Sequence, residues 1–148
     1  MFYGLNKIAD QTAIGGASYA KRFGQEPITT AHIFLNVMLM GGPVSQLLLD
    51  DAGIRLGDAA IAVREFEMPR FDGRKALRDR YTPGAIHAIE LAAKQAAELH
   101  LEDGATNKEL LQGLLMEPDE EMERLLRKLE QDVDDLLQLV AHDLVETH

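Results

Sequence analysis

Apolar side chains recur at three- and four-residue steps along most of the chain, which is the period of one face of an α-helix. The first such stripe covers residues 5–23 and includes the pair Gly15-Gly16, which we expect where another helix crosses closely. The second follows Thr29-Thr30, and either threonine can cap a helix by accepting from free backbone N–H groups. Shorter stripes over 44–52 and 56–63 complete a predicted set of four helices.

The stretch 67–80 breaks this pattern because it contains Pro69, Gly73, five basic side chains and little apolar periodicity. We predict that it is a linker. Beyond it the same order of parts returns, with Thr106 before the second stripe and Pro118 at the start of the third. The apolar stripes of this second half cover 86–99, 110–115, 122–129 and 133–140.

The two halves align with each other, which predicts an internal repeat. An offset of 76 places Leu5 on Tyr81 and Thr30 on Thr106, and offsets of 78 and 77 continue the match to the end. Small residues fall on small residues and a capping threonine falls on a capping threonine. We therefore predict an all-α fold in which two pseudo-symmetric four-helix repeats pack as one domain over 1–148. The expected bounds are about 3–66 for repeat one, 67–80 for the linker and about 81–146 for repeat two.

The composition supports helices and removes several kinds of chemistry. Apolar residues make up 46% of the 148 residues, with no tryptophan and eight aromatics in total, which suits helix-on-helix packing better than a β-sandwich. The absence of cysteine excludes disulfides, zinc-thiolate sites, iron-sulfur clusters and thiol nucleophiles. The sequence has no apolar run of about 20 residues and no signal-peptide pattern, so we expect a soluble, cytoplasmic protein.

The net charge of -10 is unevenly distributed. Residues 1–80 carry 10 basic and 9 acidic side chains, whereas residues 81–148 carry 5 basic and 16 acidic ones. An acidic half repels phosphate backbones and anionic lipid, so we expect neither nucleic acid nor membrane as a partner. It suits a basic partner, or it receives the basic linker of the same chain, and both readings stay open. The linker's basic residues are Arg70, Arg74, Lys75, Arg78 and Arg80.

Three stretches resemble the N-terminal repeat domain of the Clp family of AAA+ protein unfoldases. "YTPGAIHAIELAAKQA" (81–96) is similar to the opening of a repeat in that family, and "FGQEPITTAHIFLNVML" (23–39) is similar to its glycine, helix cap and leucine-rich helix. "LLLDDAGIRL" (47–56) is similar to the family's helix that ends in Gly-Ile or Gly-Val. The resemblance covers roughly residues 3–142.

The resemblance implies a non-catalytic protein-interaction module that binds substrates or adaptors for a Clp ATPase-protease system. The chain is then either a stand-alone modulator or the N-domain of a larger chaperone. Its partners are expected to be Clp ATPase or protease subunits, adaptors and client polypeptides, with no cofactor. The nearest approach to a phosphate-binding loop, "GGASYAKR" (15–22), lacks the second glycine and the metal-binding hydroxyl, so the chain is not the motor itself.

The resemblance also implies particular residues. The family's repeat openings contribute to its interaction surface, which makes Phe2, Tyr3, Tyr81 and Thr82 candidate protein-binding residues; alternatively, the aromatic side chains fill the core. Some members recognise phosphoarginine through the acid of a Thr-Glu-His motif in each repeat. We align these acidic positions with Ala31 and Asn107, neither of which can hold a guanidinium by charge.

The histidine at the start of the second predicted helix has two possible roles. As a structural residue, His32 forms the helix entrance together with Thr29 and Thr30, as Thr106 does in the second repeat, where Lys108 aligns with His32. Alternatively, the chain is a small-ligand-binding or enzymatic helical-repeat protein that uses His32 and a carboxylate. No histidine pair has metal-ligand spacing, and the acid clusters at 117–126 and 130–137 fit solvated helix faces. We therefore predict no catalytic, metal-binding or cofactor-binding residues and no enzymatic activity.

Overall fold

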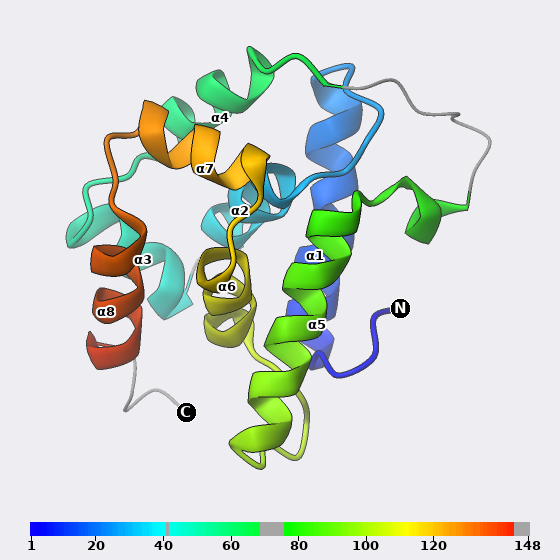
Figure 1. Cartoon of the computed structure of the whole chain (residues 1–148), viewed down its shortest axis with the longest axis vertical. Coiled ribbons are helices and arrows are strands. Elements are labelled where there is room, and N and C mark those ends of the chain that lie inside the picture. The colour runs from blue at the N-terminus through cyan, green and yellow to red at the C-terminus, as the bar shows by residue number, and fades with distance from the viewer. Residues whose placement is uncertain (41, 69–75, 144–148) are drawn as a thin grey trace.

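The fold is all-α, as predicted. A computed structural model describes residues 1–40, 42–68 and 76–143, and this part of the chain contains no β-strand (Figure 1). Of the linker's basic residues, Arg70, Arg74 and Lys75 lie outside the described residues. The first four helices are α1 (Lys7–Arg22), α2 (Thr30–Leu39), α3 (Gly42–Asp50) and α4 (Leu56–Arg64). The short 3-10 helix η1 (Leu77–Arg80) precedes α5 (Pro83–Glu98), α6 (Asn107–Met116), α7 (Glu120–Lys128) and α8 (Val133–Asp143).

The helix N-caps fix the alignment of the two repeats. Asn6 caps α1 and Thr82 caps α5, which gives the predicted offset of 76. Thr29 caps α2 and Thr106 caps α6, so the offset is already 77 at this pair of helices. Our alignment of Thr30 with Thr106 is therefore wrong by one residue, because the sequence offers two adjacent threonines and the structure uses the first as the cap.

The core is built around α2 and α6, which pack against each other in the middle of the fold. All of α2 from Thr30 to Met38 is buried, and so is all of α6 from Lys108 to Leu115. Helix α1 lies against α2, and α5 lies against α6 in the same way. The remaining helices cover this central pair (Figure 1). This covering is how a short chain buries an unbroken run of residues in each of two helices.

Small residues permit the close helix crossings, as predicted for Gly15-Gly16. A Cβ atom on Gly16 would lie 3.3 Å from the Ile33 side chain, and one on Gly15 would overlap the amide of Asn36. That amide donates to the Thr12 carbonyl at 2.8 Å. In the second repeat the glycine lies on the other helix: a Cβ on Gly113 would overlap a backbone carbonyl of α5. Both repeats therefore have a glycine at their tightest crossing.

Replacing Gly113 with alanine should lower the free energy of unfolding by about 1–3 kcal/mol, because the new methyl group overpacks the crossing. It would overlap the carbonyl oxygen of Ala88 and lie 3.1 Å from the amide nitrogen of Ala92, and a backbone cannot rotate away as a side chain can. Gly57→Ala is the matched control, since nothing lies within 4 Å of its added Cβ. Urea denaturation should show Gly57→Ala unchanged or slightly stabilised; equal stability of the two variants would contradict the tight crossing.

The openings of the two repeats, which are the segments just before α1 and α5, are exchanged: each lies against the other repeat. Leu5, which opens the first repeat, pairs with Ala105 of the second, while Tyr81, which opens the second, pairs with Ile28 of the first. The first pairing uses Asn6 N–H to Ala105 O at 2.8 Å and Ala105 N–H to Gly4 O at 2.7 Å. The second uses Ile28 N–H to Arg80 O at 2.9 Å and Thr82 N–H to Ile28 O at 3.0 Å. Each repeat therefore holds the opening of the other in place.

Within the described residues, no single helix is both long and apolar enough to cross a membrane. Helices α2 and α3 pass that test only when taken together, and they bend by 98° relative to each other.

Candidate functional site

His32 lies at the entrance of α2 and is fully buried. Its Nδ1 accepts from the backbone N–H of the cap residue Thr29 at 3.0 Å, which completes a capping box. Its Nε2 lies 2.6 Å from Oε1 of Gln25. The Gln25 amide donates in turn to the carbonyls of Val63, at 2.8 Å, and Phe66, at 3.1 Å. The histidine thus connects the start of α2 to the end of α4.

Both ring nitrogens of His32 are occupied, and this arrangement selects the neutral ring protonated at Nε2. Burial lowers the pKa of His32 to about 4, which keeps the ring uncharged at neutral pH. The ring's hydrogen-bond partners are a threonine and a glutamine. No carboxylate is among them, so the geometry gives no support to an enzymatic site built on His32 and an acid. Among the described residues no group of histidine, aspartate and glutamate is arranged to hold a metal ion.

The entrance of α6 has the same geometry with an acid in place of the histidine. Glu109 Oε1 accepts from the N–H of Thr106 at 2.8 Å and from its hydroxyl at 2.7 Å. Glu109, and not Lys108, is therefore the counterpart of His32, because the cap fixes the offset at 77. The sequence carried this signal as a Thr-x-x-Glu capping box, which our alignment overlooked.

The corrected offset also moves one of the family's acidic positions. The residue that corresponds to Ala31 in the second repeat is Lys108, and not Asn107. Lys108 is 8% exposed and carries positive charge. The two positions thus have one small apolar side chain and one cation, so this chain departs from the phosphoarginine pattern further than the sequence comparison indicated.

The four residues of the repeat openings differ in exposure. The Tyr3 side chain is 97% exposed, whereas Phe2 and Tyr81 are 5% and 4% exposed. The Phe2 and Tyr81 rings meet edge to face with centroids 5.1 Å apart, and the Tyr81 hydroxyl donates to the carbonyl of Ala13 at 2.7 Å. The Thr82 side chain caps α5. These positions agree with the alternative that the aromatic rings fill the core, and Tyr3 remains as the one of the four that reaches into solvent.

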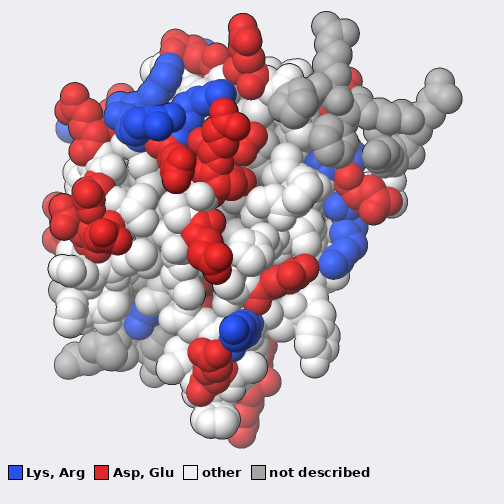
Figure 2. All heavy atoms as spheres, in the orientation of Figure 1, with Lys and Arg blue, Asp and Glu red and all other residues white. Residues whose placement is uncertain are grey.

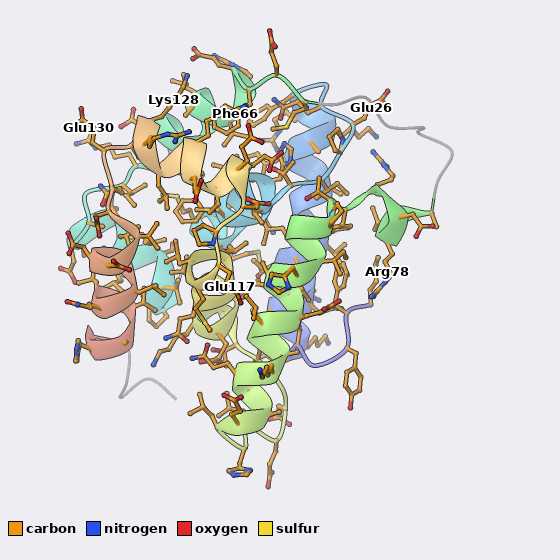
Figure 3. The ribbon with its side chains drawn as sticks, in the orientation of Figure 1. Glu26, Phe66, Arg78, Glu117, Lys128 and Glu130 are labelled. Atoms are coloured by element: carbon orange, nitrogen blue, oxygen red, sulfur yellow. The ribbon has the colours of Figure 1, made fainter. Side chains whose placement is uncertain are left out.

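Two surface hollows flank these openings. The first, of about 390 Å³, lies at the start of α5. Its lining mixes apolar side chains with both signs of charge and consists of Arg78, Asp79, Tyr81, Pro83, Ile86, His87 and Glu90. The guanidinium of Arg78 lies 5.6 Å from the centroid of the Phe2 ring (Figure 3 labels Arg78). The second hollow, of about 320 Å³, adjoins Tyr3 and the far end of α5. Sequence patterns did not indicate it, because segments about ninety residues apart form it.

Charged side chains are distributed unevenly over the surface. On the face in Figure 2, one group of basic side chains lies over α7 among acidic ones, and further basic side chains lie at the right of the view and lower on the face. From α7, Lys128 reaches Glu65 beyond the end of α4, with Nζ to Oε2 at 3.4 Å, and the Arg124 guanidinium lies 5.3 Å from the Phe66 ring centroid. Figure 3 shows Lys128 and Phe66 side by side. This basic group therefore contacts the first repeat, so part of the surface charge is used within the chain.

The described part of the chain is thus an all-α tandem-repeat domain with exchanged openings and hollows at its surface. It has the fold of the N-terminal domain of Clp chaperones, and the resemblance seen in the sequence is confirmed.

The N-terminal domain of ClpD from Arabidopsis thaliana, a caseinolytic-protease-associated chaperone, matches with a TM-score of 0.78. The match covers 98% of this chain and 97% of that one at 18% sequence identity. The chloroplastic chaperone protein ClpC2 of Oryza sativa subsp. japonica is 30% identical over 148 residues. That alignment covers 99% of this chain but 16% of ClpC2, so the chain spans about a sixth of its relative. No family model matches the chain.

Proposed function

We propose that the chain is a non-catalytic protein-interaction module that binds substrates or adaptors for a Clp ATPase-protease system. It acts either as a stand-alone modulator or as the N-domain of a larger chaperone. The observation that carries this proposal is the agreement of nearly the whole chain with the N-terminal domain of ClpD, a chaperone associated with a protease. A cytoplasmic location belongs to the proposal as well, although the rice relative is a chloroplast protein.

The geometry of the repeat openings supports a binding role. Two hollows of about 390 Å³ and 320 Å³ lie on either side of the exchanged openings, and each combines apolar side chains with charged ones. Hollows of this size fall at the lower end of the range for ligand pockets, so each suits a few side chains of an extended segment. The module then binds its partners reversibly, and a partner ATPase supplies the energy for unfolding the substrate protein.

The rival function, a ligand-binding or enzymatic site at His32, has less support. The ring is buried, uncharged and fully hydrogen-bonded to groups that hold α2 in place. It is therefore a structural residue in this proposal, together with Thr29, Thr30 and Thr106.

Capture of native-extract proteins on the immobilised chain should recover Clp ATPase or protease subunits, identified by mass spectrometry. Tyr3→Asp should reduce that recovery, because it places a charge on an exposed aromatic ring beside a hollow. A loss of about tenfold corresponds to a contact worth about 1.4 kcal/mol. Tyr81→Asp would be uninformative, since a charge at a buried position unfolds the domain.

Ile61→Asp is the matched control for the capture. Ile61 is 49% exposed on α4 and lines neither hollow at the repeat openings. Recovery of Clp subunits should be unchanged by this variant. Recovery of unrelated metabolic enzymes alone, or equal losses for the two variants, would contradict the proposed function.

A further inference from the structure

The hollow beside Tyr3 is open, apolar at its base and acidic at its rim. It lies where the N-terminal segment runs beside the C-terminal half of α5 (Figure 1). Its volume is about 320 Å³, and it is lined by Tyr3, Gly4, Leu5, Ala93, Ala96, Ala97, Leu101, Glu102, Asp103 and Gly104. The apolar part consists of the alanine face of α5 and the side chains of Leu5 and Leu101. We call this feature the Tyr3 hollow.

Two glycines in left-handed conformation are part of the lining of the Tyr3 hollow. Gly4 has φ +87° and Gly104 has φ +95°, a region that other residues rarely adopt. A Cβ on Gly4 would overlap the Ala93 side chain, and a Cβ on Gly104 would lie 2.8 Å from the Gly4 carbonyl oxygen. The Ala105 N–H donates to that same oxygen at 2.7 Å. The part of the lining around Gly4 and Gly104 is therefore tightly packed and fixed before any partner arrives.

The other exchanged opening lacks these glycines. By the offsets of the helix caps, 76 at α1 and α5 and 77 at α2 and α6, Arg80 corresponds to Gly4 and Pro27 corresponds to Gly104. Pro27 is buried, so its ring occupies space within the fold there. The pseudo-symmetry of the fold thus does not require a hollow at this place. The two glycines that line the Tyr3 hollow are particular to one of the two openings.

The rim of the Tyr3 hollow has a consistent charge. Glu102 and Asp103 are exposed at one edge, and the lining includes no lysine or arginine. The ring of Tyr3, 97% exposed at the same hollow, offers a π-face to a cation. Two carboxylates and an aromatic ring above an apolar floor complement a side chain with an apolar stem and a cationic head.

We propose that the Tyr3 hollow binds a short extended segment of a protein partner in which a lysine or arginine lies next to an apolar residue. The apolar side chain rests on the alanine face of α5, and the cation lies between Tyr3 and the carboxylates of Glu102 and Asp103. This inference rests on the proposed function and specifies the chemistry of the segment that the module recognises. The excess of acidic side chains in the second half of the chain favours the approach of such a segment.

The test is a titration of the ¹⁵N-labelled chain with a short probe, followed by two-dimensional NMR. The probe is acetyl-Gly-Leu-Arg-Leu-Gly-amide, and the control peptide has glutamate in place of arginine. The arginine peptide should shift the amide signals of Gly4, Ala97 and residues 101–104 in a saturable way, with the glutamate peptide giving little change. The double variant E102Q/D103N should weaken binding about three- to tenfold, the range expected for two exposed charge contacts.

The variant D134N/D135N is the matched control, because it removes the same charge from exposed positions at the start of α8. It should bind the arginine peptide like the unchanged chain. Equal binding of both peptides, equal losses for the two double variants, shifts confined to the hollow beside Tyr81, or no shift at about 10 mM peptide would each overturn the inference. These outcomes leave the capture of Clp subunits intact, whereas a failed capture with intact peptide binding would overturn the proposed function.

Discussion

Tyr81→Ala should lower the free energy of unfolding by about 3–5 kcal/mol, the range for removing a large buried aromatic side chain. Tyr81 is 4% exposed at the exchange of the repeat openings, where its ring meets Phe2 edge to face. Its hydroxyl donates to Ala13 of α1, so the side chain joins the opening of the second repeat to the first. Its loss leaves a cavity between the repeats. Chemical denaturation followed by circular dichroism measures this change.

Tyr81→Phe separates the packing of the ring from its hydrogen bond. It keeps the edge-to-face contact and removes the bond to Ala13, so it should cost about 0.5–1.5 kcal/mol. Tyr3→Ala is a second control, because the 97% exposed Tyr3 ring contributes little burial. A Tyr81→Ala protein as stable as the Tyr3→Ala protein would mean that the exchanged openings do not hold the repeats together.

Acidification should destabilise the domain through His32 as the pH falls from about 6.5 toward 4. Burial lowers the pKa of the folded His32 from 6.5 to about 4, so the unfolded chain binds a proton in this window while the folded chain does not. Stability from this residue is complete above the unfolded pKa and decreases as the pH falls. The loss from His32 alone reaches about 3 kcal/mol at pH 4.

His32→Gln is the variant that isolates this effect. Glutamine at the third position of a helix accepts from the cap N–H in a capping box, so the contact with Thr29 is kept without a titrating group. Urea denaturation of both proteins between pH 7 and pH 4 gives the difference. The unchanged chain should lose about 3 kcal/mol more than the variant, and parallel curves would show that His32 is not held neutral.

The helices could be predicted from the sequence because local signals determine them. Apolar periodicity and the capping threonine Thr106 each act within a few residues, and the all-α repeat fold follows from the order of such signals. The alignment failed at Thr29-Thr30, where two adjacent residues can form the same cap and only the structure shows which one does. The repeat bounds remain a proposal.

The candidate site could be predicted only in part, because long-range contacts form it. The sequence alone does not show that Phe2 and Tyr81 are buried while Tyr3 is exposed. Their exposure depends on the contact between the opening of each repeat and the other repeat. The Tyr3 hollow has one local signal, the turn at Glu102-Asp103-Gly104. Its other wall comes from the N-terminal segment, which no pattern connects to that turn.

The most direct test of the proposed function is photo-crosslinking from position 3 in living cells. p-Benzoylphenylalanine replaces Tyr3, whose ring is already aromatic and exposed, and Ile61 on α4 serves as the control position. Mass spectrometry then identifies the crosslinked proteins. We expect Clp ATPase or protease subunits, adaptors or client polypeptides to crosslink from position 3 and not from position 61. The same proteins at both positions, or none related to Clp at position 3, would contradict a protein-interaction module of a Clp system.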